Sequence, residues 1–511
     1  MALQVLMARR PRLESLFALM LGAFSVTGFA PLGWWPVPIL CIAGLVWLWQ
    51  QDISPRRAAW LGFIYGFGTF LVGVSWVYVS MHDVGKMPAW LAGAATGLLA
   101  AYLALYPALA GWLQARFQAH LQDRAPWHHT VLVIPAAWAL SEWLRGWMLT
   151  GFPWLALGYS QVDSPLAGFA PLVGVYGMAF VLCVIAALLV RAVTIRAWAS
   201  AAIALALGGA GWAAGHILWV KPFAAPFTVS LLQGNVPQEL KFVPGRFEAS
   251  ITSYRRLLDA SPARLIVLPE TAIARLSDAT GGGAGALLQA DAISVNATVI
   301  AGAPVQPAAG TYFNAAFSLG RDAGQFYAKD HLVPFGEFIP LGAHWFVNAM
   351  QMPLADFTRG GAAQTPFQLS LGRERVAIAL NICYEDLFGE EIVRQLPQAH
   401  VLLNLSNVAW FGDSLAPHQH LEISRMRALE TGRPMLRATN TGATAVIDER
   451  GRVTARLAFF TEGALVANAQ GMTGTTPFVA LRGNAAVLLV SLMILVGAYW
   501  RMRQRQRPRQ R

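Results

Sequence analysis

The stretch VAIALNICYEDL, residues 376–387, decides the fold of the second half of the chain. Seven mostly β-branched or aliphatic residues lead up to Cys383, and the polar residues Tyr384, Glu385 and Asp386 follow it. This pattern predicts a buried strand that ends at an exposed turn, with a thiol at the turn. Because most free cysteines are only small buried hydrophobic residues, the other strand ends of the chain must be considered with it.

Two further apolar runs end in charged residues. RLIVLPE (264–270) ends in Glu270. GQFYAKDHLVPFGEFIP (324–340) holds Lys329 after its first apolar residues and Glu337 eight positions later. A thiol is a strong nucleophile only as a thiolate; a nearby lysine favours that charged form, and a carboxylate can accept its proton. The three strand ends therefore predict a nucleophile, a cation and a base at one site.

Such a site forms a thioester from an ester, an amide or a nitrile. Lys329 and the backbone N–H of Tyr384 would stabilise the oxyanion of the tetrahedral intermediate. Water as the acceptor gives a hydrolase, whereas an amine in a dry pocket gives an acyltransferase. This chemistry requires neither a metal nor a cofactor, and the sequence has no CxxC pair, histidine cluster or phosphate-binding glycine loop that predicts one.

Composition divides the chain into unlike parts. The 511 residues are 56% apolar and only 13% charged. Residues 1–220 are nearly continuous apolar segments, and we expect a transmembrane bundle of about seven helices there. Residues 221–480 have the composition of a soluble α/β domain, which would carry the catalytic residues. Residues 481–511 would form a last transmembrane helix and a basic cytoplasmic tail.

Eight apolar segments approach the roughly 20 residues that a bilayer-spanning helix requires. They lie at residues 13–30, 35–50, 57–80, 88–114, 129–148, 166–190, 197–219 and 484–500. Arginines gather in alternate connections and in the tail, and with eight spans they all lie on one side, which positive charge marks as the cytoplasm. Both termini are therefore expected in the cytoplasm and the α/β domain outside it. The excess positive charge, +11 net, lies in these connections and in the tail. It predicts contact with anionic lipid and not with nucleic acid.

Strand-like and helix-like stretches alternate through the soluble part. Strands are expected at residues 227–233, 264–269, 297–305, 312–320, 374–382, 400–406 and 443–449, and helices at 246–260, 283–293 and 416–431. Continuous apolar strands are typical of sheets that are covered on both faces, so the order predicts a layered α/β architecture.

One loop of the apolar part is suited to lipid. EWLRGWMLTGFPWLALGYSQ (142–161) places Glu142 and Arg145 three residues apart, where they can pair on one face of a helix, and it adds Trp154 and other aromatic rings. The loop is either an aromatic belt that anchors the helix or a site for a lipid headgroup and acyl chain.

A second loop, LGAHWFVNAMQMPLADF (341–357), is apolar although it lies between predicted elements of the soluble domain. Trp345 and Phe346 would cost free energy if water surrounded them. The loop is therefore either packed in the core or a lid that dips into the bilayer, and the neighbouring spans favour the lid.

The separated stretches LPE, YAKDHLVPFGEFIP and NICYED resemble the Glu-Lys-Cys signature of the nitrilase superfamily. The HLVPFGE segment, the loop 142–161 and the flanking apolar segments are similar to one branch, the bacterial apolipoprotein N-acyltransferases. This resemblance implies an α-β-β-α sandwich, carried as an extracytoplasmic domain by a multi-span helical bundle in the bacterial inner membrane. It also implies acyl transfer from a phospholipid, typically the sn-1 chain of phosphatidylethanolamine, to the N-terminal amine of a diacylglyceryl apolipoprotein.

Residue by residue, the resemblance implies that Glu270 is the general base, Lys329 the stabiliser of thiolate and oxyanion, and Cys383 the acylated nucleophile. Glu337 would support the lysine and the base. Further matched positions, with implied roles beside the nucleophile or in a pocket or lid, are Tyr384, Glu385, Gln233, Gly234, Asn235, Asn404, Ser406, Asn407, Trp410 and Phe411. The chain departs from some family members at Phe242, where they have Trp.

Two other functions remain open at this point. A membrane-tethered amidase or nitrilase of the same superfamily would act on a soluble periplasmic substrate, which needs neither of the two lipid-suited loops. A transporter with a periplasmic binding domain would leave the nucleophile, cation and base unexplained, and charged residues within the predicted spans are sparse.

Overall fold

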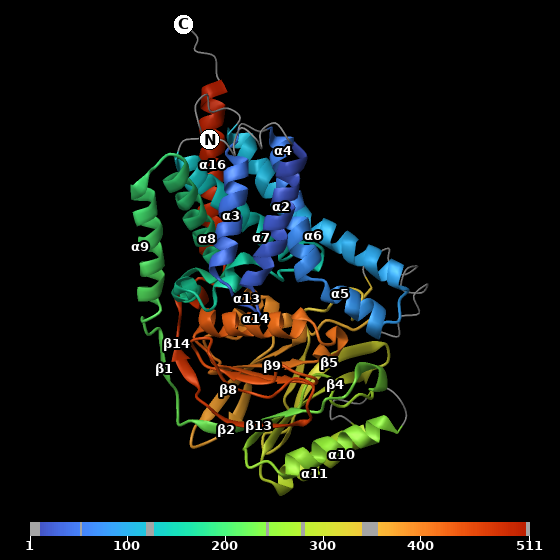
Figure 1. Ribbon diagram of the computed structural model, residues 1–511. Helices are drawn as coiled ribbons and strands as arrows, with labels where there is room; N and C mark the ends of the chain where they lie inside the picture. Colours follow the sequence, from blue (N-terminus) through green and yellow to red (C-terminus); the bar gives the residue numbers. More distant parts are fainter. Residues whose placement is uncertain are drawn as a thin grey trace. The chain divides into compact units, whose positions relative to one another are not determined.

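The computed structural model describes residues 11–51, 54–118, 127–241, 245–276, 282–339 and 356–506. These residues form two compact units, each with its own interior (Figure 1). The helical unit comprises the described residues within 1–78, 88–217 and 483–511. The α/β unit comprises residues 79–87 and the described residues within 218–482. Residues 79–87 therefore belong to the α/β unit, although the chain reaches and leaves them through helices of the other unit.

Apolar helices make up the helical unit. They are α2 (Pro11–Ser25), α3 (Pro36–Trp49), α4 (Pro55–Gly73), α6 (Ala89–Gln118), α7 (Ile134–Arg145), α8 (Ala170–Thr194), α9 (Trp198–Ala214) and α16 (Ala485–Gln506). Each of the eight predicted apolar segments thus contains a helix. Proline stands at the first or second position of several of these helices, where the missing N–H costs no intrahelical bond.

Not all of these helices are long enough to cross a bilayer. Within the described residues, Ala89–Gln118, Pro165–Thr194 and Ala485–Gln504 have the required length and hydropathy. A fourth span results if α4 and its continuation Trp76–Val84, which is bent by 49°, count as one. Helices α3 and α9 are apolar but shorter. The number of eight spans therefore stays a prediction.

Glycines allow two helices of this unit to pack closely. A Cβ on Gly62 of α4 would lie 2.3 Å from the carbonyl oxygen of Pro107, and a Cβ on Gly111 of α6 would lie 2.4 Å from that of Ala58. The Trp49 indole N–H also donates to the Ala58 carbonyl, at 3.0 Å. Small residues at such contacts let two backbones approach in an apolar environment, where close packing drives helix association.

Two six-stranded sheets form the centre of the α/β unit. The first has the order β13-β2-β3-β4-β5-β6, from Gly463–Ala469, Phe227–Gln233, Leu265–Val267, Thr298–Ala308, Thr311–Gly320 and Phe326–Ala328. The second has the order β12-β11-β10-β9-β8-β7, from Val453–Arg456, Ala445–Ile447, Met435–Thr439, Val401–Ser406, Arg375–Ile382 and Phe367–Ser370. The strands β2, β3 and β4 are parallel, as are β8, β9 and β10, so their carboxyl ends meet at one edge of each sheet.

The sheets pack face to face, with helices on their outer faces (Figure 1). Their shared core is apolar and includes Leu231, Leu265, Ile300, Leu380, Leu403 and Leu436. Helices α10 (Arg246–Asp259) and α11 (Gly282–Ser294) cover the first sheet, and α14 (Leu415–Thr431) covers the second. The predicted α-β-β-α sandwich is therefore confirmed.

The three predicted helices and seven predicted strands of this unit are all present, with ends shifted by a few residues. The sequence analysis missed several strands, among them β10 and β13. Strand β10 contains Arg437, which is fully buried, and β13 is rich in alanine and glycine with partly exposed side chains. Neither strand has the continuous β-branched pattern that marks the others.

Replacing Gly111 with alanine should lower the midpoint of thermal unfolding in detergent, because the new Cβ would collide with the Ala58 carbonyl. The matched change Gly97→Ala lies in the same helix, where a Cβ meets no atom within 4 Å, and should stabilise by up to about 1 kcal/mol through helix propensity. Equal midpoints for the two variants would show that α4 and α6 do not depend on this close approach.

Candidate active site

Cys383 stands where β8 ends and a short helix, η8 (Cys383–Leu387), begins. Its thiol is partly buried, and its backbone has a φ of 52°. Residues other than glycine rarely adopt this left-handed conformation, and where they do the surrounding structure must hold them. The predicted position of the thiol at a strand end is therefore present, in a backbone conformation that the sequence did not indicate.

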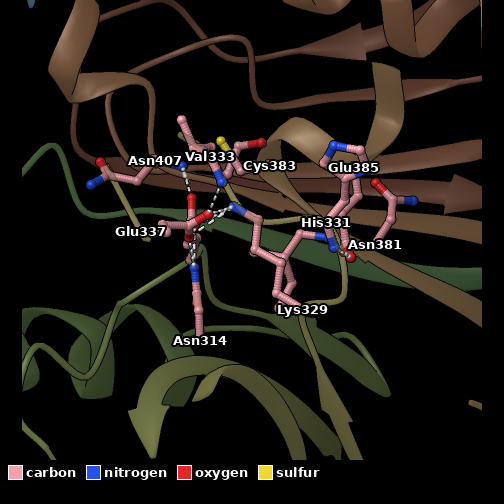
Figure 2. A network of polar contacts seen from close by, with 12 residues as sticks. Asn314, Lys329, His331, Val333, Glu337, Asn381, Cys383, Glu385 and Asn407 are labelled. Atoms are coloured by element: carbon pink, nitrogen blue, oxygen red, sulfur yellow. Dashed lines mark hydrogen bonds and ion pairs between the residues drawn. The ribbon is translucent and has the colours of Figure 1, made fainter. Parts of the chain in front are cut away.

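Lys329 follows β6 and is buried between two carboxylates (Figure 2). Its Nζ lies 2.9 and 2.8 Å from the two carboxylate oxygens of Glu337 and 3.6 Å from Oε1 of Glu270. Burial alone would lower the pKa of Lys329, but the two carboxylates raise it above its ordinary value. The lysine is therefore a fixed cation and not a proton carrier.

Glu270 is held by groups from both sheets. Asn314 of β5 donates through Nδ2 to Oε1 of Glu270 and to Oε1 of Glu337, at 2.7 Å each. The backbone N–H of Asn407, directly after β9, donates to the other oxygen of Glu270 at 2.8 Å. The Val333 N–H donates to Glu337 at 2.8 Å. These contacts fix the orientation of both carboxylates, and Figure 2 shows those made by Asn314, Val333 and Asn407.

The pKa of the Cys383 thiol depends on its burial and on the charges around it. Burial raises its pKa, the Glu270 carboxylate raises it further, and the Lys329 ammonium acts in the opposite direction without compensating. The effect of Lys329 on the thiol pKa has the direction that the sequence analysis expected, and burial opposes it.

The residues that follow the thiol are buried, and the predicted exposed turn was wrong. Glu385 accepts hydrogen bonds from the backbone N–H groups of Ile382, Asp330 and His331, at 2.6, 2.7 and 3.1 Å, and from the Tyr327 hydroxyl at 2.9 Å. Burial raises the pKa of Glu385 to about 7, and the backbone donors act in the opposite direction. Its carboxylate thus joins the start of η8 to the segment that carries Lys329. The Tyr384 ring lies 5.3 Å from that of Phe388.

Three other predicted pocket residues hold the main chain near the site. Gln233 donates through Nε2 to the carbonyls of Ala458 and Thr461, and Asn235 donates to that of Phe460 at 2.9 Å. Asn407 also donates through Nδ2 to Gln238 Oε1, at 2.7 Å. Of these three, Asn407 contacts Glu270 directly, whereas Gln233 and Asn235 position the loop at 458–461. The partly buried Trp410 and Phe411 lie in η10 (Val408–Phe411), the turn that follows Asn407.

Glu142, Arg145 and Trp154 lie within the helical unit, and all three are buried. Arg145 Nη1 donates to the carbonyls of Phe152 and Trp154 at 2.6 Å each, and Glu142 Oε1 accepts from the Leu157 N–H at 3.0 Å. The predicted ion pair is present but long, at 4.0 Å. Both charged side chains therefore hold backbone groups of the loop that follows their helix. A role of these residues in lipid binding stays a prediction. The predicted lid residues Trp345 and Phe346, and also Phe242, lie outside the described residues.

Sequence reasoning missed Lys241, a second buried lysine of the site. Its Nζ donates to the backbone carbonyl of Glu270 at 3.2 Å. Burial lowers its pKa to about 8, against the attraction of Glu270 and Cys383. A single lysine in a predicted loop gives no signal of burial, so only the fold could reveal it. Across the described residues, no group of three or more His, Cys, Asp or Glu side chains is placed to hold a metal ion.

The sandwich of two six-stranded sheets has the carbon-nitrogen hydrolase fold, and residues 229–478 match the carbon-nitrogen hydrolase family. Residues 21–188 match the apolipoprotein N-acyltransferase N-terminal domain. The chain is 47% identical to the apolipoprotein N-acyltransferase of Ralstonia nicotianae, over 98% of this chain and 96% of the relative. It is also 47% identical to that of Nitrosomonas europaea, over 95% of this chain and 97% of the relative. The chain belongs to the apolipoprotein N-acyltransferase family.

Among solved structures, that of a carbon-nitrogen hydrolase from Helicobacter pylori G27 is similar with a TM-score of 0.36 and 17% identity, covering 55% of this chain and 95% of that one.

Glu385→Gln should destabilise the α/β unit by about 1–3 kcal/mol, because the amide cannot accept at its nitrogen and leaves a buried donor without an acceptor. Thermal unfolding at pH 8, above the pKa of this carboxyl, measures the effect. Glu374→Gln, at an exposed position directly before β8, is the matched control and should leave the midpoint unchanged. An unchanged midpoint for Glu385→Gln would contradict the role assigned to this carboxylate.

Proposed function

We propose that this chain transfers a fatty acyl group from a phospholipid to the N-terminal amine of a lipoprotein, with Cys383 as nucleophile, Glu270 as base and Lys329 as oxyanion stabiliser. The observation that carries the proposal is the buried Lys329 ammonium, clamped by two carboxylates at the edge where the strand bearing Cys383 ends. The names of relatives that are 47% identical over nearly the whole chain supply the class of acceptor.

In the first step, the Cys383 sulfur attacks the ester carbonyl of the donor. The thiol proton passes to Glu270 as the C–S bond forms, a transfer that suits a thiol whose pKa burial raises. Lys329 and the Tyr384 N–H stabilise the negative charge on the former carbonyl oxygen. When the ester C–O bond breaks, Glu270 returns the proton to the departing glycerol oxygen, and a lyso-phospholipid leaves.

In the second step, the amine of the acceptor attacks the thioester. Glu270 accepts the proton that the amine loses as the C–N bond forms, and it returns that proton to the sulfur when the C–S bond breaks. The acceptor is the N-terminal diacylglyceryl-cysteine of an apolipoprotein, and the donor is the sn-1 chain of phosphatidylethanolamine; both follow from the family resemblance. No step requires a cofactor.

The membrane arrangement that fits this function has the helical unit in the bacterial inner membrane, both termini in the cytoplasm and the α/β domain at 221–480 in the periplasm. The apolar helices and the arginine-rich tail support this arrangement. Diacylglyceryl lipoproteins and phospholipids would then both reach the site from the membrane surface.

Incubation with phospholipid alone should add one acyl group to Cys383, seen as an increase in intact mass, and release about one equivalent of lyso-lipid per enzyme before the reaction stops. Cys383→Ala should abolish both signals because it removes the nucleophile. Cys383→Ser should abolish them as well, because a hydroxyl has a far higher pKa than a thiol. Cys41→Ala, which changes a cysteine buried in the helical unit, is the matched control and should behave as wild type.

Two outcomes would contradict the proposed mechanism. Continuous release of free fatty acid would indicate a hydrolase of the amidase or nitrilase type. Lyso-lipid that appears only in the presence of the lipoprotein would indicate a ternary complex in place of two separate steps.

The orientation is tested by reporter fusions. A reporter that is active only in the periplasm should be active when fused after residue 230 and inactive when fused at Arg511. A reporter active only in the cytoplasm should give the reverse result at both positions. If the first reporter is active at Arg511, the eight-span arrangement is wrong.

A further inference from the structure

The structure contains a buried polar cluster behind the nucleophile that the proposed mechanism does not use. It consists of Asp386, Asn404, His420, Ser424 and Arg437, and each of these residues is at most 1% exposed. The cluster draws on η8, β9, α14 and β10. The contacts of these five residues show which part of the site they hold.

Two members of the cluster bind the same backbone carbonyl, that of Cys383. Asn404 donates to it through Nδ2 at 3.1 Å, and the His420 Nε2 lies 3.3 Å from it. A carbonyl oxygen has two lone pairs, so both donors can be accommodated. Because Cys383 has a φ of 52°, a left-handed conformation in a residue with a side chain, these contacts hold the backbone in an arrangement that it would not adopt alone.

The two donors are themselves fixed. The His420 Nε2 also lies 2.7 Å from Oδ1 of Asp386, so this nitrogen carries the proton and shares it between two acceptors. Ser424 donates to Oδ2 of Asp386 at 2.5 Å. Arg437 Nη1 donates to the same Oδ2 at 2.9 Å and to Asn404 Oδ1 at 3.1 Å. The Arg437 guanidinium therefore contacts Asn404 directly, and it also contacts Asp386, the carboxylate that holds His420.

The surroundings of His420 shift its pKa. Burial and the neighbouring Arg437 lower its pKa, while the positive charge of Arg437 balances the carboxylate of Asp386. Its Nε2 contacts a backbone carbonyl and a carboxylate. These two contacts place His420 between the Cys383 carbonyl and the Asp386 carboxylate.

The held carbonyl belongs to the same peptide unit as the backbone N–H of Tyr384. A peptide unit is planar and trans, so its C=O and N–H point in opposite directions and cannot turn independently. We propose that Asn404 and His420 are positioning residues, which hold the Cys383 carbonyl and thereby aim the Tyr384 N–H at the oxygen of the reacting acyl group. Hydrogen bonds to the carbonyl also polarise the peptide and strengthen its N–H as a donor. This inference rests on the proposed function, in which that N–H stabilises the oxyanion.

The test compares His420→Leu, which removes the donor, with His420→Gln, which keeps an N–H donor of similar reach. The first measurement is the rate of the lyso-lipid burst in a single turnover with phospholipid. Loss of one oxyanion donor costs roughly 10²–10³ in rate, so misaiming it should slow the burst of His420→Leu by about ten- to a hundredfold. The phospholipid concentration at half-saturation should not change, and His420→Gln should stay within a few-fold of wild type.

The second measurement separates orientation of the N–H from general damage. Alkylation of Cys383 by iodoacetamide forms no oxyanion, so its rate should be nearly the same in wild type and His420→Leu. If alkylation slows as much as the burst, or if the glutamine and leucine variants lose the burst equally, the cluster only supports the fold and the inference is wrong. An unchanged burst in His420→Leu also overturns it.

Two further arms keep the test decisive. If His420→Leu does not fold, Ser424→Ala removes one support of Asp386, and it should slow the burst to a smaller degree while leaving alkylation unchanged; an unchanged burst there contradicts the inference. If wild-type enzyme gives no burst and no acyl adduct on Cys383, the proposed function fails, which is a different result from a normal burst that His420→Leu does not affect.

Discussion

The ion cluster of Lys329 with Glu270 and Glu337 is the interaction on which the site depends. An ammonium buried away from water costs several kcal/mol unless anions and hydrogen bonds compensate it. Here the compensation comes from segments far apart in sequence, which must assemble together: the turn after β3, the end of β6 and the loop at 333–337. Since Asn407 also binds Glu270, the two sheets are joined at the same point. The same contacts therefore join the two sheets and fix the charged residues of the candidate site.

The sequence was informative where apolar strands end in reactive side chains. Glu270, Lys329 and Cys383 each follow an apolar run, and reactive side chains at three strand ends indicated one site. The strand order did not follow from the sequence, since β6, which precedes Lys329, pairs antiparallel with β5. The buried supports could not be predicted either. Lys241 and His420 are single polar residues without periodicity, and their partners lie 29 to 37 positions away along the chain. Glu385 was expected at an exposed turn because charged residues usually are, but four donors from the fold keep it inside.

Charged residues in the helical unit show the same limit. The spacing of Glu142 and Arg145 indicated a pair, but it could not show that backbone groups of the following loop would occupy both side chains. Helix lengths were also less certain than helix positions, because hydropathy detects apolar residues, whereas the ends of a helix depend on local contacts. The bend after α4 is one such end, and the segment that follows it leaves the helical unit.

That segment, residues 79–87, packs with the α/β unit and contacts η10, the turn next to Asn407. The chain therefore crosses between the two units four times, after residues 78, 87, 217 and 482. A gene fragment encoding only residues 218–482 would lack part of its own folded unit. The coding sequence of the α/β unit is thus divided in two by that of the helical unit. A single recombination event could therefore not exchange the α/β unit for that of a soluble relative. If the α/β unit descends from a soluble relative, residues 79–87 and the surface that they contact must have evolved together.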